Sequence, residues 1–300
     1  MKDLKEILNK AKSLGPKKIA VANALDFEVI LALKKAKKEK IAEGILTGRK
    51  EEIEKLLDKA EINSGYFDIE NIEDEFSASQ FCCDLINKGK ADVLMKGLVG
   101  TASFMKAILD KQRGIGTGKL LSHLAVFEIF NFSRILMLTD AAINISPDLL
   151  EKAQIIQNAA DFAHRLGMFD PKVLCITPVE KINPEKLPST VDCACLSMMA
   201  KRGQIKGALV DGPFGLDNAV SEEAARIKKI KSPLAGKADI LLAPDIEAGN
   251  VLYKTLTELA GARCGAVVLG TKVPVVLTSR ADNFETKFLS IALAVAGSGK

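Results

Sequence analysis

A hydroxyl, a permanent cation and a carboxylate stand together in Ser279-Arg280-Ala281-Asp282, near the end of the sequence. The apolar, β-rich run Val273–Thr278 predicts a buried strand just before them, and Glu285–Ala294 has the apolar spacing of a helix. Strand ends and helix starts in α/β proteins present unpaired N–H groups that bind anions. Ser279, Arg280 and Asp282 are therefore candidate catalytic residues. The alternative is an ordinary helix capped by Ser279 or Asp282, with Arg280 on the surface.

A second loop with anion-binding chemistry starts at Lys96, after the expected strand Ala91–Met95 and before an expected helix. Its glycines allow close approach of the backbone, the helix start supplies N–H donors, and Lys96 supplies charge. It is not a Walker A loop, because there the lysine follows the last glycine. Lys96, Gly97 and Thr101 are candidate substrate-binding residues. The alternative is an ordinary strand-to-helix turn.

Polar residues also follow other expected strands, and this pattern predicts ligand contacts. We take as further candidate substrate-binding residues Asp140, Asn144, Asp211, Asp245 and Asn250. His123 lies within the apolar strand expected over Leu120–Phe127 and is kept as a candidate, although a single histidine there is more often a packed core residue than a catalyst. The glycine-rich run Arg113–Lys119 lacks the spacing of a phosphate loop, so we expect a flexible connection.

Strands and helices alternate along the sequence and must position these side chains. The first strands are expected at 18–21, 42–46, 67–69 and 91–95, with helices at 4–14, 26–38, 50–59 and 77–88. Such alternation predicts mostly parallel sheets in an α/β fold. A chain of 300 residues is longer than one compact domain usually is, so two domains are expected.

The composition favours a small anionic ligand over a nucleic acid. The chain has 42 basic and 38 acidic residues, a net charge of +4, and only 5% aromatic residues with no tryptophan. A stacking platform for bases is therefore poorly supported. No pair of the 6 cysteines has C-x-x-C spacing and the 2 histidines do not cluster with them, so we expect no metal site.

The expected location is the cytoplasm. Met1–Lys12 is a lysine-rich amphipathic segment without the apolar core of a signal peptide, and no run approaches the roughly 20 apolar residues that span a bilayer. The cysteines lie in mostly apolar surroundings and are expected to be reduced.

Taken together, these loops resemble the phosphate acetyltransferase/phosphate butyryltransferase family over nearly the whole chain. The motifs are MKGLV from Met95, TDAAIN from Thr139, DGP from Asp211, KADIL from Lys237 running to PDIEAGN from Pro244, and TSRAD from Thr278. Each is weak alone, but five in order are specific. The Ser-Arg-Ala-Asp form is closer to the butyryl branch than to acetyl enzymes, which typically show Ser-Arg-Gly.

The resemblance implies transfer of a short acyl group, here butyryl, between coenzyme A and inorganic phosphate. It also implies two α/β domains with mostly parallel sheets and an interdomain cleft, as in isocitrate and isopropylmalate dehydrogenases. The first domain would comprise residues 1–140 and 272–300, and the second residues 141–271. The expected partners are acyl-CoA and phosphate as substrates and a second copy of the chain in a homodimer or larger homo-oligomer. No permanently bound cofactor, nucleic acid or membrane is expected.

The family's residue roles transfer only in part. In acetyl enzymes the serine of the Ser-Arg pair assists the coenzyme A thiol and the arginine holds phosphate, which corresponds to Ser279 and Arg280. The aspartate proposed as the thiol's base is replaced here by Thr286, and the nearby Asp282 and Glu285 are not equivalent to it. Lys106 falls about where acetyl enzymes carry a helix arginine, and it becomes a further substrate-binding candidate.

Two other functions remain open. The two-domain fold is shared with metal- and nicotinamide-dependent decarboxylating dehydrogenases, and Asp211, Asp217 and Asp245 would suit a cation, but no arginine-rich substrate helix is apparent. Thr286 keeps open a non-catalytic protein that binds acyl-CoA or phosphate. The acyltransferase is favoured on the five motifs. We expect direct attack by phosphate in a ternary complex, because no cysteine or serine has an adjacent histidine to activate it as a nucleophile.

Overall fold

The computed structural model describes residues 1–63, 65–279 and 281–299. The chain divides into two compact units. The terminal unit comprises Leu4–Lys119 and Cys264–Lys300, and the central unit comprises Leu120–Arg263 with Met1–Asp3. Both units are built of helices packed on a mostly parallel sheet, so the expected α/β class is confirmed.

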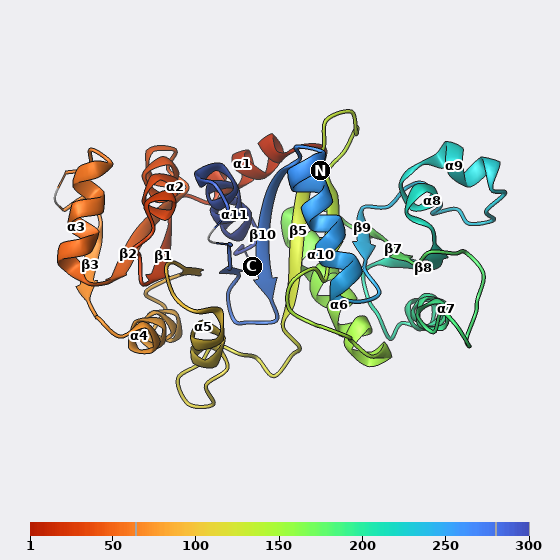
Figure 1. Cartoon of the computed structure of the whole chain (residues 1–300), viewed down its shortest axis with the longest axis horizontal. Coiled ribbons are helices and arrows are strands. Elements are labelled where there is room, and N and C mark those ends of the chain that lie inside the picture. Colours follow the sequence, from red (N-terminus) through yellow and green to blue (C-terminus); the bar gives the residue numbers. More distant parts are fainter. Residues whose placement is uncertain (64, 280, 300) are drawn as a thin grey trace. The chain divides into compact units, whose positions relative to one another are not determined.

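The sheet of the terminal unit has the strand order β3-β2-β1-β4-β11-β10 (Figure 1). Its strands are β1 (Lys17–Ala22), β2 (Ala42–Gly48), β3 (Asp68–Asn71), β4 (Val93–Lys96), β10 (Arg263–Leu269) and β11 (Val275–Val276). Neighbouring strands are parallel except β10 and β11. The carboxyl ends of β1, β4 and β11 therefore lie at one edge of this sheet.

Helices cover both faces of this sheet. They are α1 (Leu4–Ser13), α2 (Phe27–Lys38), α3 (Lys50–Lys59), α4 (Glu75–Asn87), α5 (Thr101–Ile108) and α11 (Phe284–Ala296). Figure 1 shows α1, α2 and α11 on one face and α4 and α5 on the other. Every residue of α11 from Lys287 to Ala296 is buried, since the helix is apolar on nearly all sides and packs against α1 and α2.

The sheet of the central unit has the strand order β5-β6-β9-β7-β8. Its strands are β5 (Ser122–Glu128), β6 (Leu136–Thr139), β7 (Lys172–Ile176), β8 (Leu209–Phe214) and β9 (Ile240–Leu242). Only β5 and β6 are antiparallel. Because β5 and β6 join this sheet through β9, the units divide after Lys119 and after Arg263, whereas the sequence predicts divisions after Asp140 and after Thr271.

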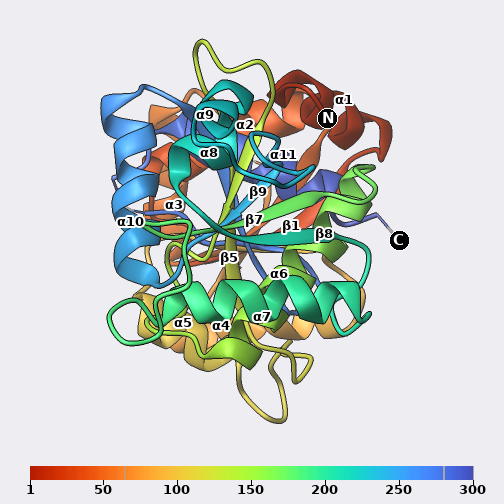
Figure 2. The same cartoon turned by 90° about the vertical axis from the view of Figure 1, so that its right-hand side faces the viewer.

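Five α-helices and a short π-helix complete the described part of the central unit: α6 (Leu149–Leu166), α7 (Ser189–Lys201), α8 (Leu216–Val220), α9 (Glu222–Ile227), α10 (Ile246–Lys254) and η1 (Thr255–Leu259). Figure 2 shows α6 and α7 below the sheet and α8 and α9 above it. Among the helices described in either unit, none is long and apolar enough to cross a bilayer.

The connection Arg113–Lys119 is held by specific bonds. The N–H groups of Ile115 and Gly116 both donate to the Ile108 carbonyl, and Arg113 pairs with Asp84 at 2.5 Å. The expectation of a flexible connection is not supported by these contacts, because they tie Arg113 to α4 and Ile115 and Gly116 to the end of α5.

Candidate active site

The segment after β11 forms a compact turn around Ser279 and Asp282. The Ser279 N–H donates to Oδ2 of Asp282 at 2.8 Å, and the Asp282 N–H donates back to the Ser279 carbonyl at 3.2 Å. The Ala281 N–H lies 3.3 Å from Oγ of Ser279, which is exposed. Arg280 lies outside the described residues. Asp282 therefore holds the backbone that carries Ser279.

The cap of the following helix is neither Ser279 nor Asp282. Asn283 is the N-cap of α11 and accepts the Thr286 N–H on Oδ1 at 2.9 Å. The simpler explanation of this segment as a serine- or aspartate-capped helix is therefore wrong. Thr286 sits in the first turn of α11, where it brings a hydroxyl and no carboxylate that would accept a thiol proton.

The loop after β4 is locked against the end of β1. The N–H groups of Gly97 and Leu98 donate to the carbonyls of Ala22 and Asn23 at 2.9 and 2.7 Å. A Cβ on Gly97 would lie 2.2 Å from the Asn23 carbonyl oxygen, so only glycine fits. Lys96 is 4% exposed, and its Nζ lies 3.3 Å from the Gly97 carbonyl oxygen.

The helix start beyond this loop is less suited to an anion than its sequence suggests. The Gly100 N–H already donates to the Glu75 carboxylate at 3.0 Å. Thr101 is the first residue of α5 and is exposed. Lys106, further along the same helix, is also exposed, and its Nζ lies 5.2 Å from the centre of the Phe76 ring. A carboxylate therefore competes with any anion for the N-terminus of α5.

Neighbouring strands bring the Lys96 loop and the Ser279 turn to the same sheet edge. Met95 pairs with Val276 in the parallel β4–β11 ladder. Lys96 follows Met95 directly and Ser279 follows Val276 by three positions, so both leave the sheet at its carboxyl-end edge. Strands in a ladder lie ~4.8 Å apart. The terminal unit thus brings a lysine and a serine hydroxyl to one edge.

Asp140 is the centre of a buried hydrogen-bond cluster in the central unit. It is 3% exposed. Oδ1 accepts the N–H groups of Ala142 and Ile143 at 2.8 and 2.9 Å, and Oδ2 accepts the His123 N–H and Asn144 Nδ2 at 3.0 and 2.7 Å. These contacts make Asp140 the residue that shapes the loop after β6.

Helix α10 packs onto this loop. A Cβ on Gly249 would lie 2.3 Å from the Asp140 carbonyl oxygen, and Nδ2 of Asn250 donates to the Ala141 carbonyl at 3.0 Å. Asp245 is the N-cap of α10 and accepts the Ala248 N–H at 2.8 Å. The structure therefore brings Asp140, Asn144 and Asn250 together and gives Asp245 a capping role.

Two further candidates have structural surroundings. The His123 ring is 4% exposed and lies 5.9 Å from the Tyr253 ring, centre to centre. Asp211 was expected in a turn, but it lies within β8, where Ser197 and Ser232 donate their hydroxyls to it at 3.2 and 2.6 Å. Because β9 and β7 separate β8 from β6, the sheet does not bring Asp211 to Asp140.

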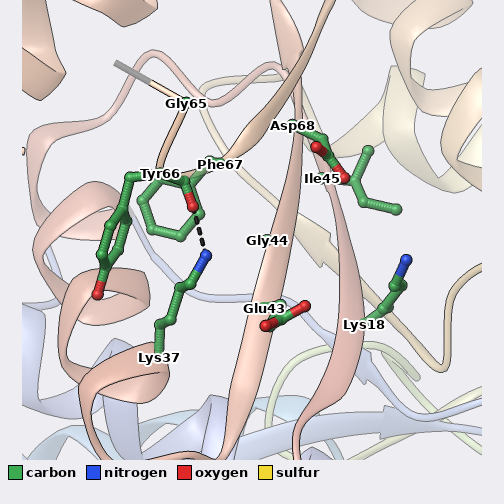
Figure 3. Close-up of a pocket in the computed structure, with 9 residues that line it drawn as sticks. All are labelled: Lys18, Lys37, Glu43, Gly44, Ile45, Gly65, Tyr66, Phe67 and Asp68. Carbon is green, nitrogen blue, oxygen red and sulfur yellow. Dashed lines mark hydrogen bonds between the residues drawn. The ribbon is translucent and has the colours of Figure 1, made fainter. Parts of the chain in front are cut away.

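A cavity of about 90 Å³ lies elsewhere in the terminal unit (Figure 3). Lys18, Glu43 and Asp68 line it near the amino ends of β1, β2 and β3, and Lys37 closes one side by donating to the Tyr66 carbonyl at 2.5 Å. Parallel strands put their amino ends at the edge opposite Lys96 and Ser279. This cavity is therefore separate from the candidate active site.

Three of the buried cysteines are poor nucleophiles. Burial raises the pKa of Cys83 to about 12 and also raises that of Cys82, while the adjacent Cys193 thiol and burial raise the pKa of Cys175. These thiols stay protonated at neutral pH. Across residues 1–63, 65–279 and 281–299, no three His, Cys, Asp or Glu side chains are grouped to hold a metal ion.

Comparisons with known sequences agree with the motifs. A family model described as phosphate acetyl/butaryl transferase matches residues 75–295. The chain is 48% identical over 293 residues to a phosphate butyryltransferase of Clostridium beijerinckii, covering 98% of this chain and 97% of that protein. It is 46% identical over 291 residues to a phosphate acetyltransferase of Thermotoga maritima, covering 97% and 98%.

Solved structures agree as well. A branched-chain phosphotransacylase from Enterococcus faecalis V583 matches with a TM-score of 0.85 and 33% identity, over 94% of this chain and 99% of that one. A 4-hydroxythreonine-4-phosphate dehydrogenase from Klebsiella pneumoniae matches with a TM-score of 0.56 and 12% identity, over 95% and 100%, and shows the fold alone. The resemblance read from the loops is confirmed, and the chain belongs to the phosphate acetyl/butyryl transferase family of enzymes.

Proposed function

We propose that this enzyme transfers a short acyl group, preferably butyryl, between coenzyme A and inorganic phosphate. The family membership supports the reaction class, and the 48% identical phosphate butyryltransferase supports the four-carbon preference. The structural observation that carries the proposal is the Ser279–Asp282 turn, which exposes a serine hydroxyl beside Arg280 in the sequence at the carboxyl-end edge of a sheet.

The chemistry needs no covalent enzyme intermediate. A phosphate oxygen attacks the thioester carbonyl carbon, the C–S bond breaks, and coenzyme A leaves as a thiolate that takes up a proton. Orientation of two bound reactants supplies ~7–11 kcal/mol of such a barrier. Ser279 donates a hydrogen bond to the developing oxyanion or thiolate, Arg280 binds phosphate through its planar fork of donors, and Lys96 adds positive charge at the same edge.

Several finer features belong to the same proposal. Acyl-CoA and phosphate are substrates, and no cofactor is permanently bound. The chain works in the cytoplasm as a homodimer or larger homo-oligomer. Asp282 serves the turn through its bond to the Ser279 N–H, so the proton of the thiol in the reverse reaction goes to a bound water or to another group.

Acyl chain length is the direct test of the proposed substrate. Phosphate-dependent thiol release is measured for acetyl-, propionyl-, butyryl- and isobutyryl-CoA, with purified protein and no added metal. The expected kcat/KM peaks at butyryl-CoA, and one methylene is worth ~1–3 kcal/mol in such pockets. A peak at acetyl-CoA would instead favour phosphate acetyltransferase activity, as the 46% identical Thermotoga maritima protein suggests. No release from folded protein would reject the proposal.

Arg280→Lys tests the phosphate site. A lysine keeps the charge but loses the paired donors that match two phosphate oxygens. We expect the KM for phosphate to rise and kcat to fall by at least about tenfold, equal to ~1.4 kcal/mol. Steady-state kinetics with phosphate varied at saturating butyryl-CoA measure both. Lys231→Arg on the exposed surface is the matched control, and wild-type kinetics in Arg280→Lys would remove Arg280 from the site.

A further inference from the structure

We infer that Lys287 and Asp26 form a positioning device for the Ser279–Asp282 turn, an inference that rests on the proposed function of that turn. Lys287 lies in the first turns of α11, and its side chain is only 1% exposed. Its Nζ donates to the Asp282 carbonyl at 2.7 Å and lies 3.3 Å from Oδ2 of Asp26. One buried ammonium thus joins the turn to the start of α2.

Asp26 is itself fixed. It is the N-cap of α2, where Oδ1 accepts the N–H groups of Glu28 and Val29 at 2.9 and 3.3 Å, and its side chain is 15% exposed. The cap leaves Oδ2 for Lys287. The start of α2 therefore fixes the Asp26 carboxylate, which pairs with the Lys287 ammonium, and this ammonium in turn binds the Asp282 carbonyl in the turn.

The last link reaches Ser279. Lys287 fixes the Asp282 carbonyl, and the Asp282 carboxylate accepts the Ser279 N–H at 2.8 Å. A shift of the Asp282 backbone would therefore move Ser279. Displacements of about 1 Å in groups that orient a reaction cost on the order of a hundredfold in rate.

Stability alone does not explain a buried lysine at this place. Burying a charge pair costs desolvation free energy, and replacing such a pair by well-packed apolar residues of similar volume often leaves the stability of the fold unchanged or raises it. The rest of α11 from Phe288 to Ala296 is uncharged and buried. The one ammonium on this buried stretch of helix is directed at the turn that carries the candidate catalytic residues, which points to a positioning role.

The test compares three variants in the full-length enzyme. Lys287→Met removes the ammonium and keeps the length of the side chain. Asp26→Asn keeps the α2 cap and removes the charge partner. Lys35→Met is the matched control, because Lys35 also lies at the α2–α11 contact, with Nζ 4.3 Å from the centre of the Phe288 ring, but does not touch the turn.

In Lys287→Met we expect kcat for butyryl-CoA to fall at least about tenfold, while the KM for butyryl-CoA stays within about twofold of the wild type. In Asp26→Asn we expect a smaller fall in kcat. In Lys35→Met we expect kcat to stay unchanged. Hydrogen exchange of the amides in residues 278–283 should become faster most strongly in Lys287→Met, less strongly in Asp26→Asn, and not at all in Lys35→Met. Assays run well below each variant's Tm, and Asp26→Asn decides the matter if Lys287→Met does not fold.

Unchanged kcat and unchanged exchange in the folded variants would overturn the inference. An equal loss in Lys35→Met would do so too, because it would mean that general loosening of the helix contact is responsible. If wild-type protein releases no thiol, the proposed function fails, and the exchange data still show whether Lys287 holds the turn.

Discussion

Ser279→Ala is expected to release thiol from butyryl-CoA on the order of 10²–10³ times more slowly than the wild type, with little change in KM. The hydroxyl is exposed, and its hydrogen bond within the described turn is the weak contact from the Ala281 N–H at 3.3 Å. The turn itself is held by backbone groups and by Asp282. The substitution therefore removes the donor to the oxyanion or thiolate and leaves the scaffold in place.

Steady-state kinetics and a thermal melt measure this prediction together. Ser13→Ala is the control: its hydroxyl, also exposed, donates to the Lys10 carbonyl at 2.8 Å near the end of α1. Both variants should melt within about 2 °C of the wild type, since surface substitutions change stability by only ~0.5 kcal/mol. A Ser279→Ala enzyme within threefold of wild-type kcat would show that the hydroxyl takes no part in the reaction.

Local sequence predicts the order of elements around Ser279 because periodicity and turn chemistry are local properties. It does not decide the helix cap, since Ser279, Asp282 and Asn283 are all good capping residues. The choice falls to Asn283 because α11 must begin where it can bury Phe288 and the apolar residues after it. Tertiary packing thus selects among locally equivalent starts, and so frees Ser279 from a capping role.

Contacts between distant segments lie beyond such reasoning. Lys287 looks like a solvent-facing residue in a helix until α2 brings Asp26 to it. Asp211 looks like a turn residue at a strand end, but hydroxyls from Ser197 and Ser232 satisfy its carboxylate inside β8. In both cases the partner comes from another element, and no spacing within either segment encodes the pairing.

Asp140→Ala is expected to lower the free energy of unfolding by about 3–5 kcal/mol. The carboxylate accepts hydrogen bonds from four donors, of which the bond from the His123 N–H is buried and those from Ala142, Ile143 and Asn144 are partly buried. Alanine leaves these donors without their acceptor, and each buried donor left unsatisfied costs ~1–3 kcal/mol. Urea unfolding at pH 7, followed by far-ultraviolet circular dichroism, measures the change.

Asp245→Ala is the matched comparison, because that carboxylate accepts the Ala248 N–H as the cap of α10 and its loss should cost only ~1 kcal/mol. Asp140→Asn should fall between the two, because the amide keeps one acceptor oxygen but turns an NH₂ toward donors. A loss below about 1 kcal/mol in Asp140→Ala would mean that water replaces the carboxylate. That outcome would indicate that the loop after β6 is open to solvent. Asp140 would then be a candidate for direct contact with substrate.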